Sequence, residues 1–159
     1  MRKEEVLSQL TTGFKDDIVE VFDKSIKRVY LEIKPESLVK IASFIFKDLG
    51  ARFNIASGVD TRFFMEILYH FTLEDINLLI SLRVKLNKSK KLEIDSLASL
   101  CEGANWIERE IHELLGINFK GHPDPRRLLL SDDWPEGVYP LRCDYKEWDK
   151  KAIRDRGTE

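Results

Sequence analysis

The chain has 159 residues, of which 43% are hydrophobic and 34% are charged, and its formal net charge is −2. A chain of this length has room for one domain with a modest core and a tail. Charges of both signs in near balance give no electrostatic basis for capturing nucleic acid or an anionic membrane surface, so neither is expected as a partner.

Cysteine content and hydropathy narrow the class of protein further. Cys101 and Cys143 are too few for a disulfide framework or for the four thiolates of an iron–sulfur cluster. No apolar run approaches the roughly 20 residues that span a bilayer, and the start of the chain lacks the uninterrupted apolar segment of a secretory signal. We therefore expect a reduced, intracellular protein that reaches a membrane only through partner subunits.

The first fifty residues predict a helix, a loop, a strand and a second helix. Residues 1–23 are typical of a short amphipathic helix followed by an acidic loop. Residues 28–33 alternate between apolar and polar side chains, which indicates a half-buried strand. Apolar residues at helical spacing between Pro35 and Gly50 predict a helix over 35–49.

Three further strands are predicted beyond that helix. One begins at Phe53, and Gly58 with Asp60 marks the turn that ends it. Residues 63–71 and 76–87 alternate clearly, and the short connection between them predicts a hairpin. We expect an α+β fold: an antiparallel sheet of about four strands with helices packed on one face, followed by a helix and an extended irregular C-terminal tail.

The last third of the chain predicts one well-defined helix and then irregular structure. A short helix is expected over 91–103, and a second helix is expected to begin at Asn105, with Glu108 completing a capping box, and to end at Gly116. Its apolar stripe predicts that its charged side chains point away from the core. The predicted organisation is an α+β domain over 1–103, an interface helix with a proline-rich strap and tail over 104–145, and a charged end over 146–159.

The carboxylates of the second helix are candidates for acid–base catalysis. The sequence supplies no nucleophile beside Glu108, Glu110 and Glu113, and ion pairs with Arg109 along the helix account for them at about 0.2 to 0.5 kcal/mol a pair. The favoured interpretation is therefore an ion-paired helix face, with catalysis as the alternative.

Cofactor-binding patterns give no stronger candidate. A metal site would have to combine residues that match none of the CxxC, HxxxH and HExxH spacings, namely Cys101, His112, His122 and Cys143. The glycines form neither a dinucleotide-binding fingerprint nor a phosphate-binding loop. We expect no cofactor and no metal in this chain.

Arginines near prolines and aromatic residues favour a protein interface. Arg126, Arg127 and Arg142 can each form paired hydrogen bonds with a carboxylate. They stand in the proline-rich segment, beside a run of leucines and close to Trp134. Such mixtures are enriched where proteins bind one another.

Two stretches carry a family resemblance: E-R-E-x-x-E-x-x-G-I-x-F-x-G-H-P-D-P-R-R-L-L-L over 108–130 and D-D-W-P-E-G-V-Y-P-L-R-C-D-Y over 132–145. They resemble the respiratory-chain complex I 30 kDa subunit family, which includes the matching subunits of membrane-bound, energy-converting nickel–iron hydrogenases. The resemblance implies an α+β domain without a cofactor, on the cytoplasmic side of the membrane. It also implies packing against a large catalytic subunit and a small iron–sulfur subunit, which hold the iron–sulfur clusters and, in a hydrogenase, the nickel–iron centre.

The resemblance also implies which residues meet those subunits. The positions that match the family's motifs are Glu108, Arg109, Glu110, Glu113, Gly116, Gly121, His122, Pro123, Asp124, Arg126, Arg127, Trp134, Pro140, Leu141, Arg142 and Asp144. Two positions depart from the pattern: Pro125 stands where complex I members commonly have leucine, and Cys143 stands where lysine is usual.

The spacing of DDWPEG before YPLR is more similar to the hydrogenase-type branch. A subunit of a hydrogenase-like or ferredoxin-linked complex is therefore the favoured hypothesis. The alternatives are a subunit of a quinone-reducing complex I, a free-standing small enzyme that uses the Glu108 to Glu113 helix with His122, and a transient assembly factor.

Overall fold

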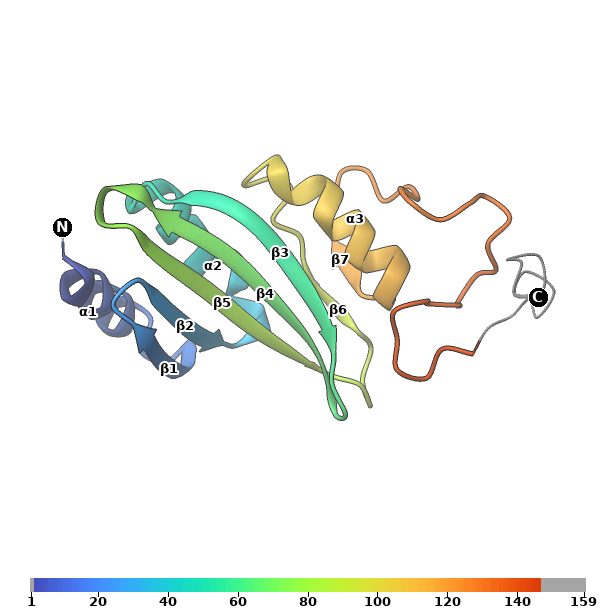
Figure 1. The fold of residues 1–159 in the computed structure, drawn as a ribbon, viewed down its shortest axis with the longest axis horizontal. Coiled ribbons are helices and arrows are strands. Elements are labelled where there is room, and N and C mark those ends of the chain that lie inside the picture. The colour runs from blue at the N-terminus through green and yellow to red at the C-terminus, as the bar shows by residue number, and fades with distance from the viewer. Residues whose placement is uncertain (1, 147–159) are drawn as a thin grey trace, which may run out of the picture.

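A five-stranded sheet is the centre of the computed structural model, which describes residues 2–146 (Figure 1). The strand order across the sheet is β1-β2-β5-β4-β3. All neighbouring strands are antiparallel except β2 and β5, which are parallel. The α+β class is confirmed, but the sheet has one strand more than expected and contains a parallel pair. The strands are β1 (Ile18–Ser25), β2 (Arg28–Ile33), β3 (Arg52–Asp60), β4 (Phe64–Leu73) and β5 (Leu78–Asn87).

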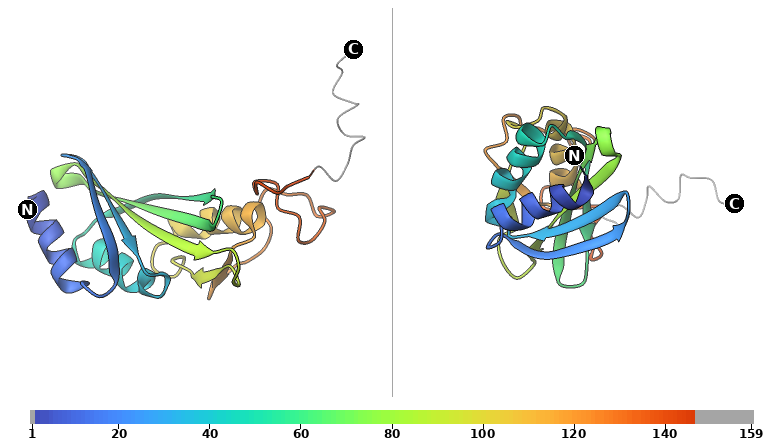
Figure 2. Two further views of the ribbon diagram at one scale, coloured as in Figure 1. Left: turned by 90° about the horizontal axis from the view of Figure 1, so that it is seen from below. Right: turned by 90° about the vertical axis from the view of Figure 1, so that its left-hand side faces the viewer.

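The helices pack on one face of this sheet, as predicted (Figure 2). They are α1 (Lys3–Gly13), α2 (Leu38–Ser43) and α3 (Gly103–Leu115). The predicted helix over 35–49 is present as α2 between a 3-10 turn, Pro35–Ser37, and a π turn, Phe44–Asp48. Apolar residues of all three helices join the strands in one core.

The alternation in β5 shows why one face is covered and the other is open. Leu78, Ile80, Leu82 and Val84 are buried, and each such side chain contributes about 1.5 to 3 kcal/mol relative to exposure. The opposite side of the sheet carries ion pairs between neighbouring strands: Arg83 with Glu66 at 2.9 Å and Lys85 with Glu32 at 2.6 Å. We call this side the open face.

Two predictions in the N-terminal half are wrong. Residues 18–23, expected to belong to the acidic loop, form most of β1, an edge strand that pairs with β2. The side chains of β1 are almost all exposed, so no alternation reveals the strand. Gly58 and Asp60 do not form a turn, because β3 continues through both of them and pairs with β4. Gly58 is instead a contact point, where an added Cβ would clash with the Leu115 side chain of α3.

Two predictions near α3 are also wrong. The expected helix over 91–103 is absent; a short strand, β6 (Glu93–Asp95), pairs in parallel with β7 (Asn118–Lys120). Helix α3 begins at Gly103, so Asn105 lies inside it and makes no capping box with Glu108. The predicted end at Gly116 is confirmed, and this glycine has the positive φ of 73° that such an end favours.

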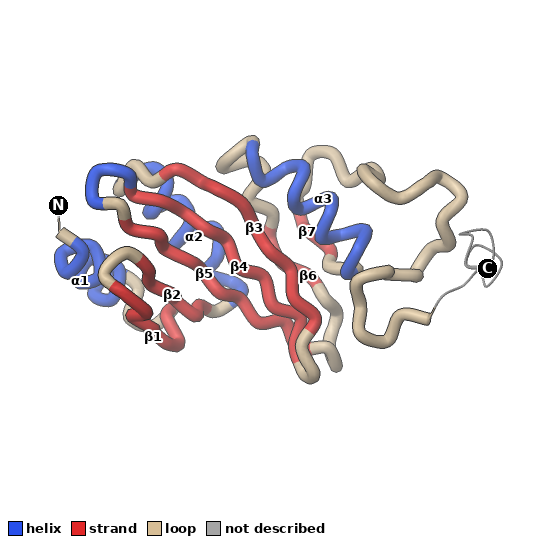
Figure 3. The backbone as a smooth tube through the Cα atoms, viewed as in Figure 1, coloured by secondary structure: helices blue, strands red, loops and turns tan. Residues whose placement is uncertain are grey.

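Residues 121–146, called the C-terminal arm below, contain neither helix nor strand (Figure 3). The irregular tail is therefore confirmed, although β7 precedes it. The predicted charged end lies, from residue 147 onward, outside the described residues. Among the helices described, none has the length and apolar character needed to cross a membrane.

Candidate functional site: helix α3 and the C-terminal arm

Glu108 points into the protein and ties α3 to strand β4 and to residues 96–97. Its fully buried carboxylate accepts hydrogen bonds from the Ser96 hydroxyl at 2.5 Å, the Leu97 amide at 2.8 Å and the Tyr69 hydroxyl at 3.4 Å. Burial raises the pKa of Glu108, and these bonds offset part of the rise. Glu108 does not form the ion pair with Arg109 that was expected along the helix. Its contacts show that Glu108 holds α3 in place.

The Glu108 carboxylate also affects two neighbouring groups. Burial and the negative charge of Glu108 raise the pKa of Tyr69 well above its ordinary value. The same two causes raise the pKa of the Cys101 thiol to about 11. Cys101 is therefore a buried, protonated thiol at neutral pH. The thiolate is the form that reacts and binds metals, so this side chain is not in its reactive form.

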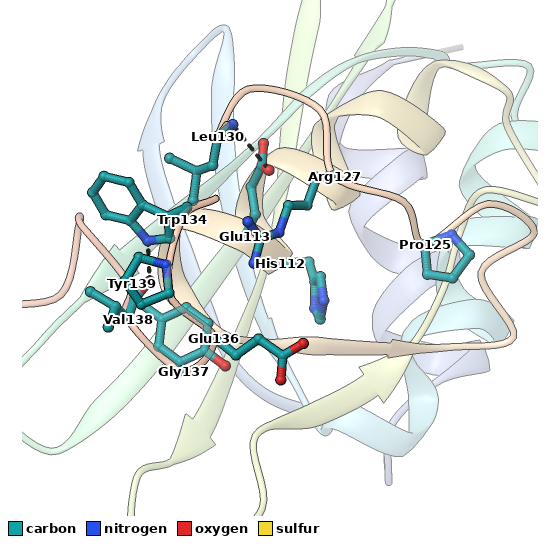
Figure 4. Close-up of a pocket in the computed structure, with 11 residues that line it drawn as sticks. His112, Glu113, Pro125, Arg127, Leu130, Trp134, Glu136, Gly137, Val138 and Tyr139 are labelled. Carbon is teal, nitrogen blue, oxygen red and sulfur yellow. Dashed lines mark hydrogen bonds between the residues drawn. The ribbon is translucent and has the colours of Figure 1, made fainter. Parts of the chain in front are cut away.

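Glu113 holds the main chain of the arm. Its side chain is buried, and its two oxygens accept from the amides of three successive residues, Leu128 at 3.1 Å, Leu129 at 2.5 Å and Leu130 at 3.3 Å. Figure 4 shows this carboxylate directed toward Leu130. Charge-assisted bonds of this kind are stronger than neutral ones, so one side chain fixes a three-residue stretch of irregular backbone.

Arg109 completes the attachment from the same helix. Its Nε donates to the carbonyl of Arg126 and its Nη2 to the carbonyl of Arg127, both at 2.7 Å, while Nη1 lies 3.5 Å from Asp124. Arg109 therefore satisfies the carbonyls of 126–127, and Glu113 satisfies the amides of 128–130. Arg109 and Glu113 point away from the core, as predicted, and they are directed to the main chain of the arm. Glu108, for which ion pairing with Arg109 was expected, points into the protein.

His122 has both ring nitrogens bonded to the main chain. Nε2 lies 3.0 Å from the Asn105 carbonyl, and Nδ1 lies 3.0 Å from the Asp124 amide, which donates to it. Nε2 also lies 4.0 Å from the buried Glu108 carboxylate. Beside the imidazole, the Arg126 guanidinium bonds both oxygens of Asp124 and holds the pKa of that carboxyl well below its usual range.

The end of the arm returns to the C-terminal end of α3. The Leu141 amide donates to the Leu114 carbonyl, and Arg142 Nε donates to the Leu115 carbonyl at 2.8 Å. A cation is favourable at this end of a helix. The guanidinium also lies over the Tyr139 ring, 4.3 Å from its centroid. A Cβ at Gly116 would approach both side chains to 2.5 Å, so only glycine fits there.

A last contact joins the arm to the sheet. The Cys143 amide donates to Asp60 at the end of β3, at 2.8 Å, and Lys88 forms an ion pair with the same carboxylate. Burial raises the pKa of Asp60, but the bonds from Lys88 and Cys143 outweigh it, so the pKa lies below the ordinary value.

A pocket of about 370 Å³ lies between α3 and residues 125–139 of the arm (Figure 4). His112 and Glu113 line it from the helix, and Trp134 and Tyr139 line it from the arm. The arm shapes this wall by itself: the Trp134 indole donates to the Val138 carbonyl and stacks on the Tyr145 ring, with centroids 6.4 Å apart.

The structure thus brings most of the predicted interface residues together on α3 and the arm. Five of them, Glu110, Gly121, Pro123, Pro140 and Asp144, take part in none of the contacts described above. Whether any of them meets a partner stays a prediction, because their observed contacts are within the chain. Two apolar side chains of the arm face solvent, Leu129 at 61% and Leu141 at 60% exposed, as does Trp106 of α3 at 69%.

Sequence reasoning missed the groups on the body that receive α3 and the arm: Ser96, Tyr69, Asp60 and Lys88. Tyr69 carried a usable signal, because a tyrosine on the core face of a strand needs a hydrogen-bond partner. Among residues 2–146, no three side chains of histidine, cysteine, aspartate or glutamate are grouped as a metal site would need.

Comparison with known proteins places this chain in a family. The model of the family described as "Respiratory-chain NADH dehydrogenase, 30 Kd subunit" matches residues 31–151. An NAD(P)H-quinone oxidoreductase subunit of Prochlorococcus marinus strain NATL1A is 34% identical over 133 residues, which are 79% of this chain and 76% of the relative. A subunit of the F(420)H(2) dehydrogenase of Methanosarcina mazei is 31% identical over 153 residues, covering 94% of this chain and 96% of the relative.

A solved structure shares the fold over almost the whole chain. It belongs to the membrane-bound sulfane sulfur reductase, an archaeal respiratory membrane complex, and matches with a TM-score of 0.80 and 16% sequence identity. The match covers 98% of this chain and 92% of the other.

Proposed function

Because the chain belongs to the respiratory-chain NADH dehydrogenase 30 kDa subunit family, we propose that it is a non-catalytic subunit of a membrane-bound electron-transfer complex. It lies on the cytoplasmic side and holds no cofactor. Its partners are the large catalytic subunit and the small iron–sulfur subunit. The iron–sulfur clusters belong to those partners, as does a nickel–iron centre if the complex is hydrogenase-like.

The observation that carries this proposal is the construction of the arm. Arg109 and Glu113 bind its main chain from α3, while the side chains of Leu129 and Leu141 face outward. An irregular segment already held in one shape loses less conformational freedom when a partner binds it, so more of the contact energy appears as affinity. Such an arm is suited to form a permanent attachment surface.

The pocket behind the arm supports the same role. Its lining combines an imidazole, aromatic rings and main-chain groups, which is a mixture found where partner side chains insert. An apolar or aromatic side chain of the large subunit is the expected occupant, with Leu129 and Leu141 contacting the surrounding surface.

Within the family we propose a hydrogenase-like or ferredoxin-linked complex, on the DDWPEG spacing. An F(420)H(2) dehydrogenase subunit is among the relatives, so complexes other than NADH dehydrogenases carry subunits similar to this chain. The second candidate is a quinone-reducing complex, and the identity to an NAD(P)H-quinone oxidoreductase subunit favours it.

A free-standing enzyme that uses the Glu108 to Glu113 helix with His122 has less support. Glu108 bonds Ser96 and Leu97, Glu113 bonds three amides, and both nitrogens of His122 bond the main chain. Groups occupied in this way hold structure together. A transient assembly factor differs from a permanent subunit only in its stoichiometry, which the following experiment measures.

The test is co-purification of the tagged full-length chain from membranes of its host in mild detergent. We expect a large catalytic subunit and an iron–sulfur subunit in equal amounts with the chain. The double variant Leu129→Ser/Leu141→Ser should lose at least nine-tenths of both partners, because it changes the outward side chains and leaves the main-chain bonds of the arm in place. The identity of the large subunit, with a nickel site or a quinone site, decides between the two branches.

Val19→Ser is the matched control, since Val19 is also an exposed apolar residue, 60% exposed, on edge strand β1. It should retain both partners. Equal recovery of partners by the double variant and the wild type would refute attachment through the arm. Partners recovered in trace amounts from mature membranes would indicate the assembly factor instead. For Arg127→Ala we expect partial release of the partners only. The Arg127 side chain donates to the Ser131 carbonyl within the arm, so it is engaged within the chain itself.

A further inference from the structure

A hollow of about 520 Å³ lies at the end of the sheet opposite the arm. It is bordered by the turn between β1 and β2, the turn between β4 and β5 and the beginning of β3, which lie at the far side of the molecule from the arm in Figures 1 and 2. Arg28, Leu79 and Thr72 are direct cross-strand neighbours there. Their side chains therefore share the open face.

One half of this hollow is cationic without compensation. Lys24, Lys27 and Arg28 line it, and no aspartate or glutamate does. Among residues 2–146, none of these three takes part in an ion pair, and Lys24 lies over the Tyr30 ring. Of the acids on the bordering turns, Asp23 is paired with Lys3 and Glu74 with Arg52, and Asp75 does not line the hollow. Three uncompensated positive charges in one hollow are notable in a chain with a net charge of −2, and such a hollow attracts anionic groups.

The other half is polar and neutral. Asn54 donates to the Thr72 hydroxyl at 2.7 Å, and Asn77 stands beside them on the turn before β5. Side-chain amides and hydroxyls both donate and accept, which suits the alternating groups of a peptide main chain. The hollow spans the sheet from β1 to β3, four strand spacings or about 19 Å, which is the length of about six residues of extended chain.

We propose that this hollow binds an extended, acidic segment of a neighbouring protein. Its carboxylates lie against Lys24, Lys27 and Arg28, and its main chain bonds the amide and hydroxyl groups of Asn54, Thr72 and Asn77. Ile26, 87% exposed at the tip of the β1–β2 turn, contacts an apolar residue flanking the acidic ones. The site is separate from the arm and does not depend on the function proposed for it.

A peptide fits better than a phosphate group or an anionic membrane. Phosphate sites use free main-chain amides, but the amides of Leu79 and Asn77 already donate to the carbonyls of Lys27 and Glu74. A compact phosphate would also leave the neutral half unused. A membrane surface would meet Ile26 and the lysines but could not enter the hollow to reach Asn54 and Thr72.

The test is fluorescence anisotropy of the full-length chain with a labelled eight-residue peptide rich in aspartate and glutamate. The same peptide with asparagine and glutamine in place of the acids is the reference. We expect the acidic peptide to bind at least tenfold more tightly than the reference and to weaken as salt is raised. The variant Lys27→Gln/Arg28→Gln should weaken it at least fivefold.

Two controls make the outcome decisive. Lys15→Gln/Lys47→Gln removes the same charge from exposed positions outside the hollow and should change binding less than twofold. Asn54→Ala/Thr72→Ala, which leaves the net charge intact, should also weaken the peptide at least twofold. Equal binding of the neutral peptide, equal loss in the Lys15/Lys47 control, or binding of inorganic phosphate or of phosphatidylserine vesicles without the peptide would overturn the proposal.

Discussion

The body and the arm are stabilised by different kinds of interaction. The body, residues 2–120, is held by buried apolar side chains contributed by strands and helices alike. The arm is held mainly by polar contacts, in which a few side chains of α3 and β3 bind main-chain groups. The difference teaches that an irregular segment can be given one shape without a core of its own, provided that its amides and carbonyls have fixed partners.

This division suits an attachment surface. Because the side chains of Leu129 and Leu141 are exposed, they remain available to a partner. Because its fixed partners lie on α3, the shape of the arm depends on the body that positions this helix. The following predictions separate the two kinds of stabilisation, beginning with the largest effect.

Phe71→Ala should destabilise the whole molecule. Phe71 is fully buried in β4, and truncating such a side chain costs about 3 to 5 kcal/mol of unfolding free energy. Chemical denaturation measures this loss. Phe63→Ala is the matched control, because that ring is 64% exposed; a change within about 0.5 kcal/mol is expected for it. Similar losses in the two variants would contradict the assignment of the core.

Glu113→Gln should loosen the arm and leave the body folded. The change removes the charge that three amides share, at a local cost of about 2 to 3 kcal/mol. Hydrogen exchange should accelerate at least tenfold at Leu128–Leu130, with no change in β4 and β5. Glu110→Gln on the same helix should alter neither region. Uniform acceleration across the whole chain would show that the arm and the body are a single cooperative unit.

Asp60→Asn should weaken the link between the arm and the sheet by about 1.5 kcal/mol near neutral pH. The folded-state pKa of Asp60 is lowered, so its contribution is present above the unfolded value of about 3.9 and is lost as pH falls through the folded pKa. The difference between variant and wild type should therefore shrink in acid. A difference that stays constant from neutral pH into acid would rule out a charged role for Asp60.

Glu108→Gln should change how stability varies with pH. The folded-state pKa of Glu108 is raised, so its contribution is fully present below the unfolded value of about 4.3 and declines as pH rises through the folded pKa. Glutamine cannot ionise, so the variant should lack this decline. Thermal unfolding measured from below the unfolded-state pKa to above the folded-state pKa tests this prediction. Parallel curves of stability against pH for the two proteins would contradict the raised pKa.

The sequence predicted those elements whose signal is local. Residues 28–33 and 76–87 form the expected strands because alternate side chains meet the core. Edge strand β1 was missed because it has no buried side to reveal it. The expected helix over 91–103 was wrong because β6 forms by pairing with β7, which lies more than twenty residues later in the chain.

The candidate site was predicted in its residues but not in its contacts. Family resemblance singled out Arg109 and Glu113, but their partners are main-chain atoms of 126–130, which every residue type carries and no sequence pattern displays. Glu108 was misassigned because its partners, Ser96 and Leu97, become neighbours only after the chain has folded. The link between Asp60 and Cys143 spans 83 residues and has no local signal.

The most direct test of the central claim compares hydrogen exchange in the isolated chain and in the complex purified from its host. If the arm is the surface that the complex covers, added protection on assembly should be greatest at residues 121–145 and on the neighbouring turns of α3. Unchanged exchange in the arm, with new protection elsewhere on the body, would contradict the account.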